Sequence, residues 1–223
     1  MRGHRGRVWL GLMRIVLFGA TGMVGSRIAA EARQRGHQVI AVSRSGRSPV
    51  PGVTATAANA SDPAKVAALA TGADAVASAC APPRDGSDPT EPFLALNRAL
   101  VRGTRDAGVR RFMVVGGAGS LEVAPGQALC DQPGFPEAYA AEALAHRAAL
   151  EYFRTDCDLD WTYVSPAAEI APGERTGRFR VDDDRLLTDA DGNSRISAED
   201  YAVAFVDELE QGAHPRARMS VAY

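Results

Sequence analysis

The sequence predicts an α/β protein: a doubly wound, mostly parallel sheet with helices on both faces and a small C-terminal lobe. Short apolar segments alternate along the chain with longer segments of helical periodicity, and the links between them are short. The pattern starts with the apolar run 15–18, which a glycine-rich turn and a helix follow at once. Alternation of this kind is typical of parallel strands joined by crossover helices, so both faces of the sheet are expected to be covered.

Six strands are expected before residue 167, each a short apolar run bounded by glycine or polar residues. They cover residues 15–18, 38–42, 53–57, 73–79, 111–115 and 161–164. The helices between them are expected from residue 23, from Asp62 as N-cap with Pro63 in the first turn, over 93–107 and over 137–155. The segment from about 167 to 223 is expected to form the lobe, with a polar turn, a helix over 198–209 and a last short strand.

Length and composition indicate one globular domain over residues 13–223. Of the 223 residues, 46% are hydrophobic and 23% are charged, which is ordinary for a soluble protein with a substantial core. The formal net charge of −2 provides no basic field for nucleic acid or for an anionic membrane surface. No apolar stretch reaches the roughly 20 residues that a transmembrane helix needs. Neither nucleic acid nor a membrane is therefore expected as a partner.

The three cysteines, Cys80, Cys130 and Cys157, are widely spaced and form no Cys-x-x-Cys pair. This spacing fits reduced thiols in a cytoplasmic protein and argues against a zinc site or a disulfide framework. Residues 1–12 are basic and then apolar, like a signal peptide, but no small-residue cleavage site precedes the first strand. We interpret them as a disordered or loosely packed N-terminal extension, with Met13 as the natural start.

The turn after the first strand carries three glycines at intervals of three, Gly19, Gly22 and Gly25. Between a strand and a helix, the first glycine allows the tight turn, the second lets backbone N–H groups reach a pyrophosphate, and the third lets helix and strand pack closely. The start of the helix adds a positive partial charge. This pattern favours a dinucleotide site of the Rossmann type over the alternative, a purely structural turn.

Ligands of such sheets bind beyond the carboxyl ends of the strands. The residues expected to contact the dinucleotide share that position and are Gly19, Thr21, Gly22, Met23, Val24, Gly25, Ser43, Arg44, Ala79, Cys80, Ala81, Gly116, Gly117, Ser165, Pro166 and Ala167. Arg44 and Arg47 follow the second strand, and no acidic residue lies between His37 and Asp62. A guanidinium pairs well with a ribose 2′-phosphate, so NADP(H) is expected in preference to NAD(H), unless these arginines are simply solvated.

Four segments, LFGATGMVG, VVGGAGSLEV, LDWTYVSPA and GNSRISAEDYA, resemble those of the atypical short-chain dehydrogenase/reductases. More narrowly, they are similar to NAD(P)H-binding proteins often labelled NADH-flavin reductases, which are related to biliverdin reductase B. The similarity runs from about Met13 to Tyr223 and so covers nearly the whole chain. The resemblance implies a Rossmann fold, NADP(H) binding and hydride transfer to a flavin or a similar acceptor.

The usual catalytic pair of short-chain reductases, Tyr-x-x-x-Lys, is absent. Lys65 is the only lysine, and none of the five tyrosines has a lysine four positions later. A ketone substrate needs a placed acid, whereas a flavin or quinone accepts hydride into a conjugated ring and can take its proton from water. The missing pair therefore favours reduction of a flavin, quinone or similar conjugated acceptor, or no catalysis at all.

The substrate side is expected along the segment 120–136 and the helix that follows, since long loops at strand ends commonly bind ligands. Ser120 and Tyr139 are the candidate catalytic residues, although Ser120 could equally satisfy a turn. His146 could protonate a substrate, but a packed histidine, or one paired with Glu142 one turn earlier, is the commoner arrangement.

No metal site is expected. The segment 189–200 resembles a calcium loop, but its glycine and its last acidic residue stand at the wrong positions, and Ser197 with Asp200 fits a helix N-cap. The functional prediction is an NADPH-dependent reductase of a small-molecule acceptor. The alternatives are a non-catalytic NADP(H)-binding protein that senses redox state or binds a partner, and an isomerase or epimerase that uses bound NADP.

Overall fold

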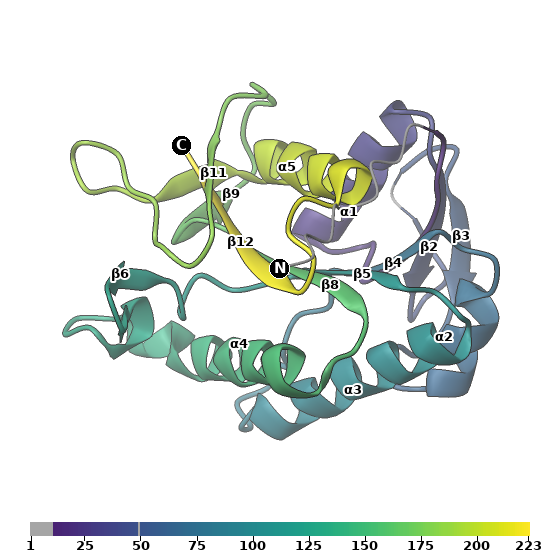
Figure 1. The fold of residues 1–223 in the computed structure, drawn as a ribbon, viewed down its shortest axis with the longest axis horizontal. Helices are drawn as coiled ribbons and strands as arrows, with labels where there is room; N and C mark the ends of the chain where they lie inside the picture. Colours follow the sequence, from purple (N-terminus) through teal and green to yellow (C-terminus); the bar gives the residue numbers. More distant parts are fainter. Residues whose placement is uncertain (1–10, 49) are drawn as a thin grey trace, which may run out of the picture.

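An eight-stranded sheet runs through the protein in a computed structural model that describes residues 11–48 and 50–223 (Figure 1). The strand order is β10-β12-β8-β5-β4-β1-β2-β3, and all neighbours are parallel except β10, which pairs antiparallel with β12. The strands are β1 (Arg14–Phe18), β2 (Gln38–Ser43), β3 (Thr54–Ala57), β4 (Ala75–Ser78), β5 (Arg111–Val115), β8 (Asp160–Ser165), β10 (Arg180–Asp182) and β12 (Ala217–Ala222). The order reverses at β1, which lies between β2 and β4, so the expected ligand crevice lies beyond the end of β1.

Helices cover both faces of this sheet, as predicted (Figure 1). They are α1 (Met23–Gln34), α2 (Pro63–Ala70), α3 (Thr90–Asp106), α4 (Glu137–Asp156) and α5 (Ala198–Gln211). Helices α1 and α5 lie on one face, and α2, α3 and α4 lie on the other. Successive side chains of β1 point to opposite faces, so Ile15 and Leu17 join the core under α1 and α5, while Val16 and Phe18 join the core on the other side.

The predicted elements agree with the structure except at their ends. The strand predicted over 73–79 is shorter, because the Ala73 amide bonds the Ala70 carbonyl and the Asp74 carboxylate accepts the Arg14 amide at 2.8 Å. Helix α3 begins at Thr90 rather than residue 93, because Asp88 Oδ1 accepts the Thr90 amide at 2.9 Å. Residues 1–10 of the predicted N-terminal extension lie outside the described residues.

The segment after residue 167 adds to the main sheet and also forms smaller structures. Strand β12 pairs with β8, and α5 packs on α1. The additional pieces are β9 (Glu169–Ala171), parallel to β11 (Arg195–Ser197), and earlier in the chain the hairpin of β6 (Glu122–Ala124) and β7 (Gln127–Ala128) with the short helix η1 (Leu129–Asp131). The predicted N-cap is confirmed, because Ser197 Oγ accepts the Asp200 amide at 2.9 Å.

Candidate functional site

The glycine turn between β1 and α1 is built differently at each of its three glycines. Gly19 has φ +75°, and a Cβ there would lie 2.6 Å from the Ala79 carbonyl group. A Cβ on Gly25 would overlap the Gly19 carbonyl oxygen. At Gly22, which is exposed, a Cβ would meet only that same oxygen at 3.5 Å, an ordinary contact. Packing therefore requires glycine at 19 and 25, whereas at Gly22 the missing side chain leaves the surface of the turn open to a ligand.

The start of α1 is suited to hold an anion. Gly22 is its N-cap, no side chain caps the helix, and its first turn carries no acidic residue. The amides at the start of a helix lack intrahelical partners and carry a positive partial charge. Uncapped amides beside the open surface of Gly22 fit a pyrophosphate, so the residues present suit a dinucleotide.

The turn after β2 places two arginines beside this crevice. The buried Ser43 hydroxyl accepts the Arg47 amide at 3.1 Å and donates to the Arg47 carbonyl at 3.0 Å, which fixes the turn. Arg44 and Arg47 are exposed on it. Burial raises the pKa of the Cys80 thiol, and the positive charge of Arg44 acts in the opposite direction. Arg44 follows β2 and Cys80 follows β4, the two strands that flank β1 in the sheet.

The ends of β5 and β8 complete this edge of the sheet. A Cβ on Gly116 would collide with the Tyr163 ring, and one on Gly117 would lie 2.9 Å from the His146 ring, so packing explains both glycines. Ser165 is different, because its hydroxyl is fully buried at the end of β8 and has no hydrogen-bond partner among the described residues. Because Ser165 has no exposed surface, only its position at the strand end supports its predicted contact with the cofactor.

The remaining predicted contact residues lie at the same edge. Thr21, Met23 and Val24 belong to the glycine turn and the start of α1, while Ala79 and Ala81 flank Cys80 after β4. Pro166 and Ala167 are buried directly after β8. All predicted cofactor contacts therefore follow five adjacent strands, β2, β1, β4, β5 and β8. Their roles in binding stay predictions.

The two candidate catalytic residues are placed very differently. The Ser120 hydroxyl and carbonyl oxygens both accept from Arg218 Nη1 at 2.9 Å. Arg218 is buried on β12 and also pairs with Asp184. Ser120 therefore connects the segment after β5 to β12, which lies two strands away in the sheet. Tyr139 lies in the first turn of α4 with 63% of its surface exposed. Of the two, Tyr139 is the one that a ligand can reach freely.

His146 is a packed histidine. Its Nδ1 lies 2.8 Å from the Tyr163 hydroxyl, and its ring stacks edge-on against Phe93. Burial lowers the pKa of His146 to about 4, so the imidazole is neutral at physiological pH and holds no acidic proton for a substrate. The alternative pairing with Glu142 does not form, because Glu142 binds Arg84 instead.

Sequence reasoning missed Arg84 and Arg218 as residues of this region. Arg84 lies in the loop between β4 and α3 and makes two hydrogen bonds of 2.9 Å to the Glu142 carboxylate. Arg218 lies in the last strand, far along the chain from Ser120. Arg84 lies 58 residues from Glu142 and Arg218 lies 98 residues from Ser120, so no local pattern could have identified these contacts.

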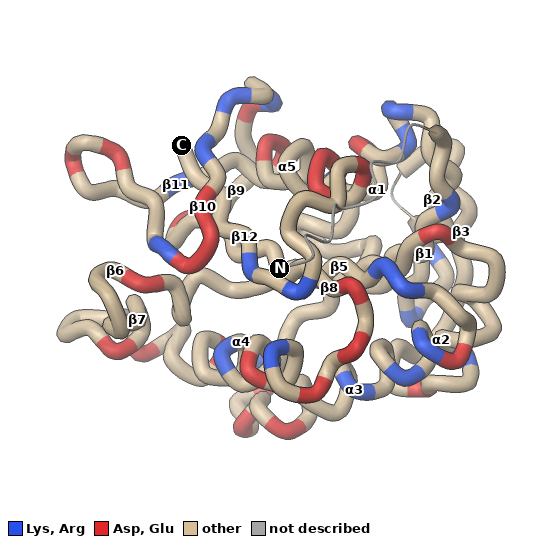
Figure 2. Tube along the Cα trace, in the orientation of Figure 1, with Lys and Arg blue, Asp and Glu red and all other residues tan. Residues whose placement is uncertain are grey.

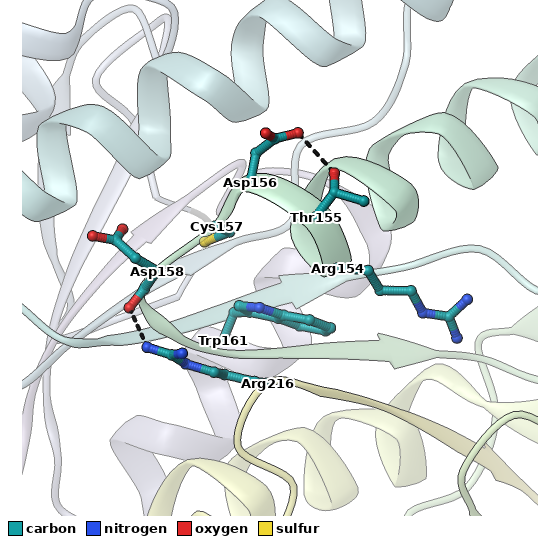
Figure 3. Close-up of a pocket in the computed structure, with 7 residues that line it drawn as sticks. All are labelled: Arg154, Thr155, Asp156, Cys157, Asp158, Trp161 and Arg216. Carbon is teal, nitrogen blue, oxygen red and sulfur yellow. Dashed lines mark hydrogen bonds between the residues drawn. The ribbon is translucent and has the colours of Figure 1, made fainter.

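A surface hollow of about 330 Å³ lies at the opposite edge of the sheet, where α4 ends and β8 begins (Figure 3). The Trp161 indole lies between Arg154 and Arg216 (Figure 3). Arg216 donates to the Asp158 carbonyl at 2.7 Å, and Arg154 pairs with Asp184 at 2.7 Å. Because protein groups already bind both cations and the hollow lies away from the carboxyl ends of the strands, it is not the candidate site.

The described residues contain no cluster of three or more side chains that could hold a metal ion. The segment that resembles a calcium loop forms a turn, in which Asp189 Oδ1 accepts the amides of Asp191 and Asn193 at 3.0 and 2.8 Å. Over the described part of the chain, no helix is both long enough and apolar enough to cross a membrane.

Comparison with known proteins identifies the family of this chain. A family model described as NAD(P)H-binding matches residues 19–211. The crystal structure of a proposed exported protein from Burkholderia pseudomallei is 58% identical, with a TM-score of 0.87 over 95% of this chain and 100% of that one. A proposed epimerase from Bacteroides thetaiotaomicron is 38% identical, with a TM-score of 0.86 over 96% and 98%. A proposed NADH-flavin reductase from Streptococcus pneumoniae TIGR4 is 34% identical, with a TM-score of 0.77 over 94% and 99%. The chain therefore belongs to the NAD(P)H-binding family.

Proposed function

We propose that this protein, an NAD(P)H-dependent oxidoreductase, transfers hydride from NADPH to a flavin, quinone or similar conjugated acceptor. The observation that carries the proposal is the open, uncapped start of α1 at Gly22, next to a substrate side that holds no Tyr-x-x-x-Lys pair. The NADH-flavin reductase name of the Streptococcus relative supports the same acceptor class.

The preference for NADPH rests on the turn after β2. Arg44 and Arg47 are exposed there, and no acidic residue stands between His37 and Asp62 to bind a ribose 2′-hydroxyl. Arginine pairs with phosphate through two parallel hydrogen bonds, which favours the 2′-phosphorylated cofactor.

The chain's own residues contribute binding and orientation rather than proton transfer. The α1 amides would hold the pyrophosphate, and Gly22 leaves the surface of the turn open to it. When bound, the reduced nicotinamide supplies the hydride. Neutral, buried His146 does not protonate the acceptor. A conjugated acceptor does not need a protein acid, since water can supply its proton. If a side chain donates that proton instead, Tyr139 is the candidate.

An epimerase, as the Bacteroides relative is named, is the weaker alternative. Epimerisation by transient oxidation and reduction of a carbon centre needs a placed acid–base group on the substrate. His146 is buried and neutral, and the Ser120 hydroxyl is bound by Arg218, so neither is well suited to that role.

The test is anaerobic flavin reduction by NADPH deuterated at the nicotinamide C4 position. Hydride transfer predicts that FMN absorbance disappears with NADPH and disappears more slowly with the deuterated cofactor. No loss of flavin or quinone absorbance, with NADPH binding intact, would contradict the reductase proposal and favour a non-catalytic binding protein. We also propose a cytoplasmic location, which the three free cysteines suit and cell fractionation would test.

A further inference from the structure

Two segments, here called the first and second walls, are joined by an ion pair on the expected acceptor side. The first wall is the loop between β4 and α3, residues 79–89, and the second wall is residues 116–146, from the end of β5 into α4. Both lie beyond the carboxyl ends of adjacent strands, β4 and β5. Arg84 from the first wall and Glu142 from the second meet in an ion pair that spans the two.

The second wall carries acidic side chains and no cation. From residue 112 to 146 the sequence has four acidic residues, Glu122, Asp131, Glu137 and Glu142, and no lysine or arginine. Figure 2 shows acidic residues at β6 and between β7 and the start of α4. The next cation, Arg147, pairs with Asp131 at 2.8 Å. Arg84 is therefore the cation that the opposite wall presents to this acidic surface.

The acids of the Arg84 loop are bound within the loop itself. Asp85 accepts the Ser87 amide and hydroxyl at 3.1 and 2.6 Å, which lowers the pKa of Asp85. Asp88 accepts the Thr90 amide at 2.9 Å. These carboxylates hold the loop and the start of α3 in place, so they do not compete with Glu142 for Arg84.

The Arg84 guanidinium keeps one edge open. Its Nε and Nη2 atoms donate to the two Glu142 oxygens at 2.9 Å, and Nη1 has no partner among the described residues. The side chain of Arg84 is 71% exposed, against 27% for Glu142. A guanidinium can bind one carboxylate along its Nε–Nη2 edge and a second anion at its Nη1–Nη2 edge. Glu142 thus orients Arg84 without using its full capacity.

We propose that Arg84 binds an anionic group on the acceptor, a phosphate or a carboxylate, through its open edge, with Glu142 as the positioning residue. This inference rests on the proposed function and narrows the acceptor to the anionic members of its class. Elsewhere along the second wall an anion would meet acidic side chains, so Arg84 determines where the anionic group of the acceptor binds.

The experiment compares acceptors that differ by one anionic group. FMN and riboflavin share the isoalloxazine ring, and 1,4-naphthoquinone-2-sulfonate and 1,4-naphthoquinone form a second pair. The dissociation constant of each acceptor is measured in the presence of saturating NADP⁺. Flavins are followed by their fluorescence, and quinones by their competition with a bound flavin. NADP⁺ occupies the start of α1, so the FMN phosphate cannot bind there, and no turnover is needed. Arg84→Gln is expected to weaken FMN about tenfold and to leave riboflavin unchanged.

Glu142→Gln is expected to change FMN affinity in the opposite direction. It keeps an amide oxygen for Arg84 and removes the carboxylate charge that repels the ligand, so FMN binding should tighten several-fold while riboflavin binding stays the same. Arg102→Gln is the matched control, since its side chain is 72% exposed on α3, and it should change neither flavin.

The outcomes separate this inference from the proposed function. Two results would show that the Arg84–Glu142 pair is only structural and would overturn the inference. In the first, Arg84→Gln weakens binding of the charged and the neutral acceptors equally. In the second, both variants weaken FMN binding to the same extent. Unchanged binding of both charged acceptors in Arg84→Gln would overturn it as well. A wild-type protein that oxidises no NADPH with any of the four acceptors contradicts the proposed function instead.

Discussion

Gly25 packs so closely on Gly19 that a Cβ at position 25 would overlap the Gly19 carbonyl oxygen, while Gly22 between them has room. Within one turn, Gly25 is therefore needed for packing, whereas Gly22 is expected to matter for cofactor binding. Gly25→Ala should destabilise the protein by about 2 kcal/mol, because the overlap forces α1 away from β1. Gly22→Ala should cost less than about 1 kcal/mol but weaken NADPH binding at least about tenfold, since the added methyl group occupies the ligand surface. Thermal unfolding and cofactor titration of both variants check this pair of expectations.

The cofactor preference can be tested at Arg44. Arg44→Ala should weaken NADPH binding about tenfold or more and leave NADH binding nearly unchanged, because only NADPH carries the 2′-phosphate. Titration of both cofactors by quenching of protein fluorescence measures the two affinities in the same variant. Equal losses for the two cofactors would remove the 2′-phosphate role.

A buried ion pair away from the site is expected to govern stability. Arg111 Nη2 donates to Glu208 Oε1 at 2.7 Å, and their side chains are only 9% and 2% exposed. Glu208→Gln should cost about 3 kcal/mol, because it leaves the Arg111 charge buried without its partner. The matched control is Glu91→Gln, whose exposed pair with Arg98 should contribute less than about 1 kcal/mol. Urea unfolding gives both values, and similar losses would contradict the account.

His214 makes this cluster pH-dependent. Its hydrogen bond to the Glu208 carboxylate, 2.8 Å long, raises the pKa of His214 above 6.5, although burial opposes the shift. A raised folded-state pKa gives stability that is fully present below the unfolded pKa and is lost as the pH rises through the folded one. Between about pH 6 and pH 9, His214→Gln should therefore lose less of its free energy of unfolding than the wild type does. A steeper decline in the variant would oppose this.

His146 should act in the opposite direction. Burial lowers the pKa of His146 to about 4, so the unfolded chain binds a proton that the folded protein does not take up until the pH approaches that value. The contribution of His146 to the free energy of unfolding is therefore complete above its pKa in the unfolded chain, roughly 6.5, and is lost as the pH falls toward its pKa in the folded protein. NMR titration of the His146 ring should show a neutral imidazole down to about pH 5, and a midpoint near neutrality would exclude the packed, neutral state.

The parts of the fold that local patterns encode could be predicted from the sequence. Apolar runs placed the main strands, Asp62 and Ser197 marked helix starts, and the glycine spacing located the turn between β1 and α1. The errors are of two kinds. Some lie at element ends, where single hydrogen bonds such as that of Asp88 decide the boundary. The others are short strands that the sequence analysis did not expect, namely β6, β7, β9, β10 and β11.

The substrate side could be predicted far less well, because long-range partners decide it. Whether Ser120 is free or bound depends on Arg218 in the last strand, and the partner of His146 is Tyr163 rather than the adjacent Glu142. Ser165 was expected to contact the cofactor from its position alone, but only the structure shows its hydroxyl buried without a partner among the described residues. Tertiary packing determines these arrangements, and no spacing in the sequence encodes them.

The most direct test of the central claim is NADPH consumption by the wild-type protein with FMN, FAD and a quinone panel, with Gly22→Ala alongside. The account predicts NADPH-dependent reduction of at least one conjugated acceptor, and a loss of that activity in the variant that parallels its loss of NADPH binding. Tight NADPH binding without oxidation by any acceptor would contradict it.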